Sequence, residues 1–161
     1  MIERTDSDHA ATPAGTFVLM RVLLIDPSVY APQYNDPLAT ALARSHDITV
    51  IGRPERPDQV ASEYPVDGHF YRLSERVRRR HVRAGLVVKP FEHAIDVARL
   101  IQRVRRDRIE VVHLQWAVVP MLDRVAIRLL RRYCPVVFTV HDTKTMHGSA
   151  NFVQRSGMRA V

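Results

Sequence analysis

Short apolar runs alternate with amphipathic helical patterns along most of this sequence, and that alternation limits the fold more than any other feature. The apolar runs are rich in Val, Leu and Ile, and they occupy 17–25, 48–51, 111–114 and 136–140. Runs of this length without polar alternation are typical of strands that are buried on both faces. We therefore predict an α/β fold, a Rossmann-like open parallel sheet with helices on both faces.

The helical patterns lie between these runs. Asp36 is placed to cap a helix that has Pro37 in its first position. A second pattern begins at Pro90, and a third covers Pro120–Tyr133, in which we expect Asp123 to face water. On the second helix, the side chains predicted to share the core-facing side are Phe91, Ala94, Ala98, Ile101 and Val104. We also expect a short strand at 69–73, whereas 74–89 fits either a basic helix or an exposed loop.

Length and composition fit one globular domain with a sizeable core. The chain has 161 residues, of which 46% are hydrophobic and 25% are charged. Residues 1–16 are polar and lack periodicity, so we expect a disordered extension before a domain that covers 17–161. The single cysteine, Cys134, excludes an intrachain disulfide and a cysteine-rich metal site, and it indicates a reducing, cytoplasmic compartment. No stretch approaches the ~20 apolar residues that span a bilayer.

The positive charge is concentrated in one segment. Between Arg72 and Arg108, eleven arginines and Lys89 stand against four carboxylates, a net charge of +8, whereas the whole chain carries +7. The densest part of this segment contains Arg78, Arg79, Arg80 and Arg83. This part is interpreted either as a surface that meets phosphates or an anionic membrane, or as the solvated face of a helix. We expect an anion other than nucleic acid, because no nucleic-acid-binding module and few interleaved aromatic residues are present.

The loops after the predicted strands are the places where ligands bind in open parallel sheets. The first such loop runs from Asp26 to Tyr30 and continues to Tyr34, Asn35 and Asp36. A helix that starts near Asp36 would offer free backbone N–H groups to an anion, although the loop also fits a purely structural connection. The dinucleotide fingerprint and the P-loop motif are both absent from the sequence.

Two later loops carry further candidate residues. Gln115 and Trp116 follow the third apolar run, where an indole can stack on a sugar ring and an amide can bond its hydroxyls. The alternative is that Trp116 packs at the edge of the core and His113 is a buried, satisfied histidine. His141 and Asp142 follow the fourth run, and we expect them to contact a ligand. A metal site and a hydrolytic triad are disfavoured, because the necessary partner residues and the G-x-S-x-G motif are missing.

Several of these segments together resemble the family-4 retaining glycosyltransferases of the GT-B fold. The first is the opening strand, helix and strand, in which a leucine-rich helix is followed by Ser45-His46-Asp47-Ile48-Thr49-Val50. The resembling segments are Met20–Asp26, Leu38–Val50, Val111–Trp116 and Val136–Asp142. The resemblance covers about residues 17–161.

The resemblance implies an N-terminal, acceptor-side domain. In such enzymes a second Rossmann-like domain with an E-x7-E motif holds most of the nucleotide-sugar, and the reaction takes place in the cleft between the domains. His141 occupies the position that contacts the donor sugar. The acceptor pocket would contain Tyr34, Asn35, Asp36, Gln115, Trp116 and Asp142. Tyr34-Asn35-Asp36 stands where family members usually have a glycine pair. No metal and no cofactor other than the nucleotide-sugar donor is implied.

These observations lead to an expected function and to alternatives. We expect the acceptor-side part of an enzyme that transfers a sugar to an acceptor such as a lipid-linked molecule or a polysaccharide. On this interpretation the chain is an incomplete, truncated form without the second domain, inactive alone, and cytoplasmic or peripheral at the inner face of the membrane. One alternative is a non-catalytic Rossmann-like module that binds an anionic partner or membrane through its arginines. Another is a small nucleotide-binding protein of flavodoxin-like architecture.

Overall fold

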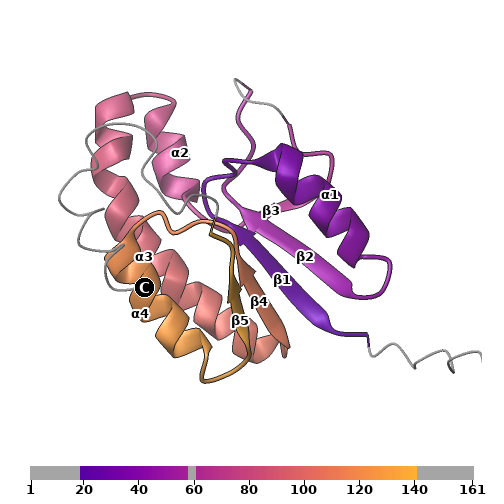
Figure 1. Ribbon diagram of the computed structural model, residues 1–161. Helices are drawn as coiled ribbons and strands as arrows, with labels where there is room; N and C mark the ends of the chain where they lie inside the picture. Colours follow the sequence, from indigo (N-terminus) through magenta and orange to yellow (C-terminus); the bar gives the residue numbers. More distant parts are fainter. Residues whose placement is uncertain (1–18, 58–60, 141–161) are drawn as a thin grey trace, which may run out of the picture.

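Five parallel strands form one sheet in the order β3-β2-β1-β4-β5 (Figure 1). The structure is a computed structural model, and it describes residues 19–57 and 61–140. The strands are β1 (Arg21–Asp26), β2 (Asp47–Gly52), β3 (Val66–Gly68), β4 (Val111–Leu114) and β5 (Val136–Phe138). The predicted Rossmann-like α/β fold with a parallel sheet is therefore confirmed.

Helices cover both faces of this sheet (Figure 1). Helix α1 (Pro32–Leu42) covers one face, where its Ala39 packs with Leu24 and Val50. Helices α3 (Val82–Arg106) and α4 (Pro120–Leu130) cover the other face. The short helix α2 (Arg72–Arg78) packs against α3. Within the described parts of the chain, no helix is both long and apolar enough to cross a membrane.

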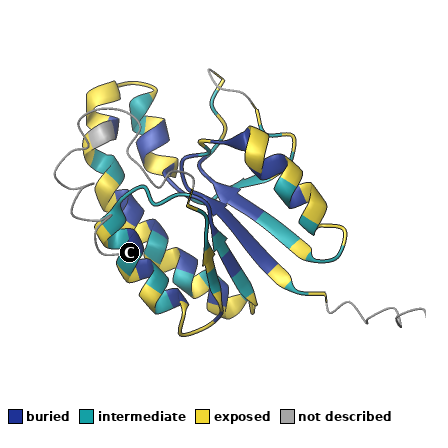
Figure 2. Ribbon diagram, in the orientation of Figure 1, coloured by how far each residue is buried: buried dark blue, intermediate teal, exposed yellow. Residues whose placement is uncertain are grey.

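The central strand β1 lies at the heart of the core. Leu23, Leu24 and Ile25 are fully buried, and Figure 2 shows this strand in dark blue between its neighbours. Leu23 and Ile25 belong to the cluster that includes Leu100 of α3, whereas Leu24 belongs to the cluster under α1. Because successive side chains point to opposite faces, a strand covered on both sides must be apolar at every position.

The start of α1 differs from the sequence prediction. The helix begins at Pro32, with Ala31 as its N-cap residue, and Pro37 lies inside it. Proline is favoured in a first helical turn, and Pro32 supplies that start one turn before Asp36. The Asp36 carboxylate instead accepts hydrogen bonds from the Ser62 hydroxyl and, at 2.7 Å, from the Glu63 backbone N–H. Asp36 therefore anchors the loop between β2 and β3.

The structure after β2 also differs from the sequence prediction of a short strand at 69–73. The strand lies at Val66–Gly68, where it pairs with Val50–Gly52, and the segment predicted as a strand at 69–73 instead leads into α2. Residues 74–89 contain most of α2 and the first two turns of α3, separated by a short connection at 79–81. Tyr71 has a left-handed backbone, with φ of 58°, and its N–H bonds the Asp96 carboxylate. That distant contact stabilises a turn that local sequence does not reveal.

The buried face of α3 was predicted wrongly in its first half. Phe91 is 73% exposed, and Ala94 and Ala98 are exposed as well, whereas Glu92, His93 and Asp96 are buried. The reason is a set of hydrogen bonds to α2, whose backbone N–H groups at Leu73 and Ser74 bond the Glu92 carboxylate at 2.6 and 2.7 Å. Beyond Ala98 the prediction is correct, because Val104 is buried in the core and Ile101 packs against it.

Candidate functional site

The carboxyl ends of the parallel strands meet at one edge of the sheet, where open α/β folds bind ligands. Asp26 at the end of β1 is in register with Gly52 of β2, and the preceding Ile25 is in register with Leu114 of β4. The loops after β1, β2 and β4 therefore lie next to one another. Their side chains form the candidate site.

Asp26 organises the first of these loops. Its Oδ2 atom accepts the Tyr30 N–H at 2.9 Å, the Ala31 N–H at 3.4 Å and the Asn35 amide at 2.8 Å. Burial raises the pKa of Asp26, and these hydrogen bonds oppose that rise. A carboxylate of the protein thus bonds two N–H groups at the entry to α1, whereas we expected a helix start near Asp36 with N–H groups free for an external anion.

Three oxygens near this loop are buried without a hydrogen-bond partner among the described residues. They are Asp26 Oδ1, Asn35 Oδ1 and Gln115 Oε1. Gln115 is close to Asp26 in the sheet, because its N–H bonds the carbonyl of Ile25 at 2.8 Å. Buried acceptors of this kind are uncommon in folded proteins, and each calls for a donor such as a water molecule or a hydroxyl of a ligand. This signal is invisible in the sequence.

A short hydrogen-bonded chain holds Gln115. The Gln115 Nε2 atom lies 3.3 Å from His113 Nε2, which lies 2.8 Å from the hydroxyl of Thr139. Burial lowers the pKa of His113, so the ring is neutral at neutral pH, and an unprotonated Nε2 has one lone pair with which to accept a hydrogen bond from the Gln115 amide or the Thr139 hydroxyl. Next to Gln115, the ring of Trp116 meets the ring of Tyr30 edge to face, with centroids 5.7 Å apart. Tyr30 is 60% exposed, so the aromatic pair borders solvent.

The structure groups some of the predicted site residues and separates others. Asn35, Gln115 and Trp116 gather around the ends of β1 and β4. Asp36 bonds the loop at Ser62 and Glu63 instead, and Tyr34 is 47% exposed on α1. His141 and Asp142 lie outside the described residues.

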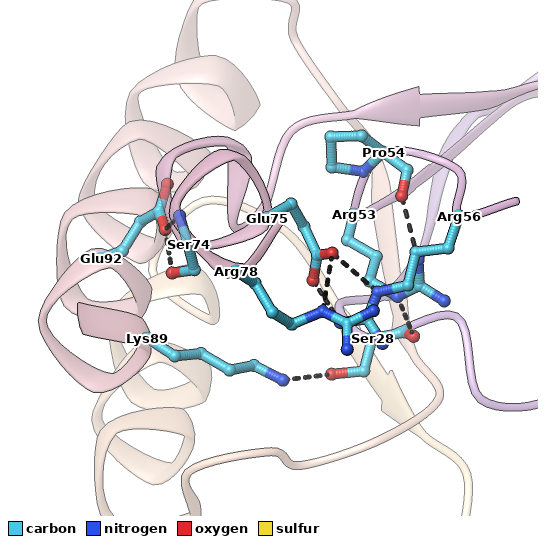
Figure 3. Close-up of polar contacts among 9 residues, drawn as sticks. All are labelled: Ser28, Arg53, Pro54, Arg56, Ser74, Glu75, Arg78, Lys89 and Glu92. Carbon is cyan, nitrogen blue, oxygen red and sulfur yellow. Dashed lines mark hydrogen bonds and ion pairs between the residues drawn. The ribbon is translucent and has the colours of Figure 1, made fainter. Parts of the chain in front are cut away.

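Beside this group lies a basic cluster, which we define as Arg53, Arg56, Arg78 and Lys89 (Figure 3). Arg53 is 3% exposed and donates to the carbonyl of Ser28 at 2.8 Å. Arg56 makes two hydrogen bonds to the Glu75 carboxylate, which also lies 3.6 Å from Arg78. The Lys89 Nζ atom lies 3.2 Å from the hydroxyl of Ser28. Three elements thus bring positive charge to the loop after β1.

The pKa shifts in this cluster follow from burial and from neighbouring charge. Burial acts to raise the pKa of Glu75, but the hydrogen bond and charge of Arg56 outweigh it and lower that pKa. Burial lowers the pKa of Lys89, and Arg56, Arg53 and Arg78 lower it further against the opposing effect of Glu75. Of these cations the sequence analysis singled out Arg78 in the densest basic stretch; Lys89 was counted only in the wider basic segment, and Arg53 and Arg56 lie outside it.

The predicted anion-binding surface of Arg78, Arg79, Arg80 and Arg83 is divided by the fold. Arg78 turns towards Glu75 and contributes to the basic cluster, whereas Arg79, Arg80 and Arg83 are exposed. Three adjacent arginines therefore serve two different surfaces.

Deeper in the protein, three side chains from distant segments form a hydrogen-bonded relay. The Tyr71 hydroxyl lies 2.6 Å from His93 Nδ1, and His93 Nε2 lies 2.7 Å from Asp123 Oδ1. Asp123 Oδ2 accepts the N–H of Val119 at 2.7 Å and so caps α4. All three relay residues are almost completely buried, and burial together with the nearby carboxylates strongly raises the pKa of Tyr71. Asp123 is therefore a core residue, and the prediction that it faces water is wrong.

Two other kinds of site, a second hollow and a metal centre, find no support in the described residues. A hollow of about 290 Å³ lies at the opposite, amino-terminal edge of the sheet, between Arg21, Asp47, Arg103 and Asp107. Two of its charged side chains are engaged in the fold, since Arg103 pairs with Asp67 at 2.6 Å and Asp107 at 3.5 Å, and Arg21 donates to the Asp107 carbonyl at 2.7 Å. Across the described ranges, no group of three His, Cys, Asp or Glu side chains is arranged to hold a metal ion.

Comparison with known families agrees with this architecture. The profile of Glycosyltransferase Family 4 matches residues 32–160, a range that runs from α1 past β5. In parallel comparisons, no curated protein and no solved structure matched the chain. The family match confirms the resemblance seen in the sequence. The chain therefore belongs to glycosyltransferase family 4.

Proposed function

We propose that this domain is the acceptor-side part of an enzyme that transfers a sugar from a nucleotide-sugar to an acceptor. The observation that carries the proposal is the set of buried acceptor oxygens on Asp26, Asn35 and Gln115, next to the aromatic pair of Tyr30 and Trp116. Hydroxyl groups of a carbohydrate donate to such oxygens, and its C–H faces pack on aromatic rings. The arrangement supports binding of a polyhydroxylated acceptor at the carboxyl edge of β1 and β4.

In the reaction, the bond between the donor sugar and its diphosphate breaks, and a bond from the same carbon to an acceptor oxygen forms. The described residues would contribute by binding and orienting the acceptor, which converts a bimolecular encounter into a positioned one. His141 would contact the donor sugar and Asp142 would border the acceptor pocket. A second Rossmann-like domain would hold most of the nucleotide, and no metal is required.

A matched pair of variants tests the acceptor site. Gln115→Leu keeps the volume of the side chain but removes its amide, whereas Gln102→Leu makes the same change at an exposed position of α3. In the complete enzyme, Gln115→Leu should raise the KM for the acceptor by up to about tenfold, because a neutral hydrogen bond contributes roughly 0.5–1.5 kcal/mol. The KM for the donor should not change. An unaltered acceptor KM in a variant that melts like the parent would disprove the proposed site.

A second experiment tests the division of labour between domains. The purified 161-residue chain, incubated with a panel of nucleotide-sugars, should release no nucleotide, because stabilisation of the leaving diphosphate would come from the second domain. Robust turnover by this chain alone would refute the assignment to an acceptor-side part.

The exposed arginines favour one additional role. Arg79, Arg80 and Arg83 present positive charge beside Val82, which is 58% exposed. Such a surface suits peripheral binding to an anionic membrane, at the inner face of the cytoplasmic membrane in this proposal, where a lipid-linked acceptor would be found.

A further inference from the structure

Lys89 and His93 lie four residues apart on α3, and each is linked to a different loop of the candidate site. The Lys89 ammonium group lies 3.2 Å from the Ser28 hydroxyl, in the loop after β1 (Figure 3). His93 contacts one oxygen of the Asp123 carboxylate, and the other oxygen accepts the N–H of Val119 at 2.7 Å, in the loop after β4. One side of α3 is therefore connected to both loops.

Tyr71 joins these two connections. The Lys89 ammonium group lies over its ring, 4.4 Å from Nζ to the centroid, and the Tyr71 hydroxyl lies 2.6 Å from His93 Nδ1. With the hydrogen of the His93 ring on Nε2, which faces the Asp123 carboxylate, Nδ1 is the acceptor for the Tyr71 hydroxyl. A continuous set of contacts thus runs through the interior from the loop after β1 to the loop after β4.

The backbone of Tyr71 is held in an unfavourable conformation. It is left-handed, with φ of 58°, at the entry to α2. Residues other than glycine rarely adopt this conformation, and they keep it only where neighbouring contacts hold it. The Asp96 carboxylate provides such a contact, because it accepts the Tyr71 N–H at 2.8 Å. Since Asp96 also belongs to α3, this helix fixes both the backbone and the hydroxyl of Tyr71.

The loop after β1 contains a second residue of this kind. Val29 has a φ of 49°, which is particularly unfavourable for a β-branched side chain. The preceding Ser28 is held by Arg53, which donates to its carbonyl, and by Lys89 at its hydroxyl. The loop then leads to Tyr30. Loss of the Lys89 contact would therefore allow the loop to relax and would displace Tyr30.

Tyr30 is the residue through which this loop meets the loop after β4. Its ring contacts the ring of Trp116 edge to face. Such a contact at the border of solvent is weak, so the spacing of the two loops depends on the contacts behind it. The connection through Lys89 and Tyr71 joins the same two loops inside the protein.

We propose that Tyr71 and Lys89 are positioning residues that hold the loops after β1 and β4 at the spacing required by the acceptor. This inference rests on the proposed function, because it takes these two loops as the acceptor site. Neither side chain contacts the acceptor. Loops that are already in place lose less entropy when a ligand binds, so the spacing acts on acceptor binding.

The fluorescence of the chain tests this proposal, because Trp116 is the single tryptophan. Tyr71→Phe keeps the ring but removes the hydroxyl that contacts His93. Tyr64→Phe makes the same change at a hydroxyl that lies 3.3 Å from the carbonyl of Ile48, near the amino end of β2. Quenching of Trp116 by acrylamide should increase in Tyr71→Phe and stay at the level of the parent in Tyr64→Phe.

A second pair of variants keeps the test valid if Tyr71→Phe does not fold. Lys89→Met removes the hydrogen bond to Ser28 but keeps an unbranched side chain. Arg83→Met removes one positive charge at an exposed position of the same helix. Quenching should increase in Lys89→Met and not in Arg83→Met. All variants are compared under conditions in which denaturant unfolding shows that they are folded.

Kinetics of the complete enzyme separate positioning from general destabilisation. Tyr71→Phe and Lys89→Met should each raise the KM for the acceptor by about threefold to tenfold, the range for loss of one hydrogen bond, and leave the donor KM unchanged. A purely structural role would reduce the amount of active enzyme, and therefore the apparent kcat, without changing the acceptor KM.

Several outcomes would overturn the proposal. Quenching in Tyr71→Phe and Lys89→Met equal to that of their controls would show that these contacts do not hold the loops. If Gln115→Leu raises the acceptor KM and these two variants do not, the proposed function stands and the positioning role fails. If they alter quenching but Gln115→Leu leaves the acceptor KM unchanged, the proposed function fails, and with it the assignment of this spacing to the acceptor.

Discussion

His93 Nε2 lies 2.7 Å from Asp123 Oδ1, and this contact joins α3 to α4 inside the core. Replacing Asp123 by Ala would leave the His93 ring and the N–H of Val119 without their acceptor. We expect the free energy of unfolding to fall by about 3 kcal/mol, because a buried pair loses one partner. Arg128→Ala, at an exposed position of the same helix, should change it by less than about 0.5 kcal/mol. Denaturant unfolding measures both, and equal effects would show that the relay contributes nothing.

The neutral His113 ring predicts a dependence of stability on pH. Burial holds the pKa of His113 below its ordinary value of 6.5, so just below that pH the unfolded chain binds a proton that the folded chain does not. The free energy of unfolding should therefore decrease as the pH falls through that range. His113→Gln should reduce the decrease between pH 7.5 and 5.5, whereas His81→Gln, at an exposed position, should not. Unfolding curves of the parent and of both variants at the two pH values measure this. If His113→Gln shows the same dependence of stability on pH as the parent, the His113 ring is not responsible for it.

His141 provides a test of the donor side. If it contacts the donor sugar, His141→Ala should change the free energy of unfolding by no more than the ~0.5 kcal/mol typical of surface positions. In the complete enzyme the same change should strongly reduce transfer, because a contact is lost where charge develops. Thermal melts and kinetics separate this result from a structural role. A large loss of stability with normal specific activity would remove His141 from the site.

Membrane binding by the exposed arginines can be measured with vesicles. Changing Arg79, Arg80 and Arg83 together to Gln should weaken binding to acidic vesicles at low salt, since each contributes about 1 kcal/mol near an anionic surface. The control changes three other exposed arginines, Arg44, Arg131 and Arg132, and so removes the same net charge. Co-sedimentation should distinguish the two variants. Equal loss in both would mean that net charge, and not this surface, governs binding.

The sequence was sufficient to predict the parallel sheet, because strands buried on both faces must be apolar at every position and this leaves a local signal. It was insufficient for α3, where Glu92 and Asp96 are buried by bonds to α2 rather than exposed as their charge suggests. The prediction that Asp123 faces water was wrong for the same reason. Its partner His93 is distant in the chain, and no local pattern shows that the two side chains meet.

The candidate site was predictable to a similar extent. The rule that ligands bind at the carboxyl ends of strands led to the loops that contain Asn35, Gln115 and Trp116. The role of Asp26 was not visible, because a carboxylate that ends a strand gives no sign that it bonds two N–H groups of the following loop and the Asn35 amide of α1. Lys89 and Arg56 were missed because each reaches the site from a separate element, so only the folded chain brings them together.

The spacing of Glu75 and Arg78 on α2 has a consequence for how the segment tolerates changes of length. Arg78 meets Glu75 because it lies three residues later, and each residue added to or removed from a helix rotates the later residues by about 100° around its axis. Deleting one residue between them would bring Arg79 to the position of Arg78, so a cation would still face Glu75. Inserting one residue would move Arg78 to the fourth position after Glu75, which also lies on the same face of the helix. The consecutive arginines therefore keep a cation beside Glu75 after a change of one residue in either direction.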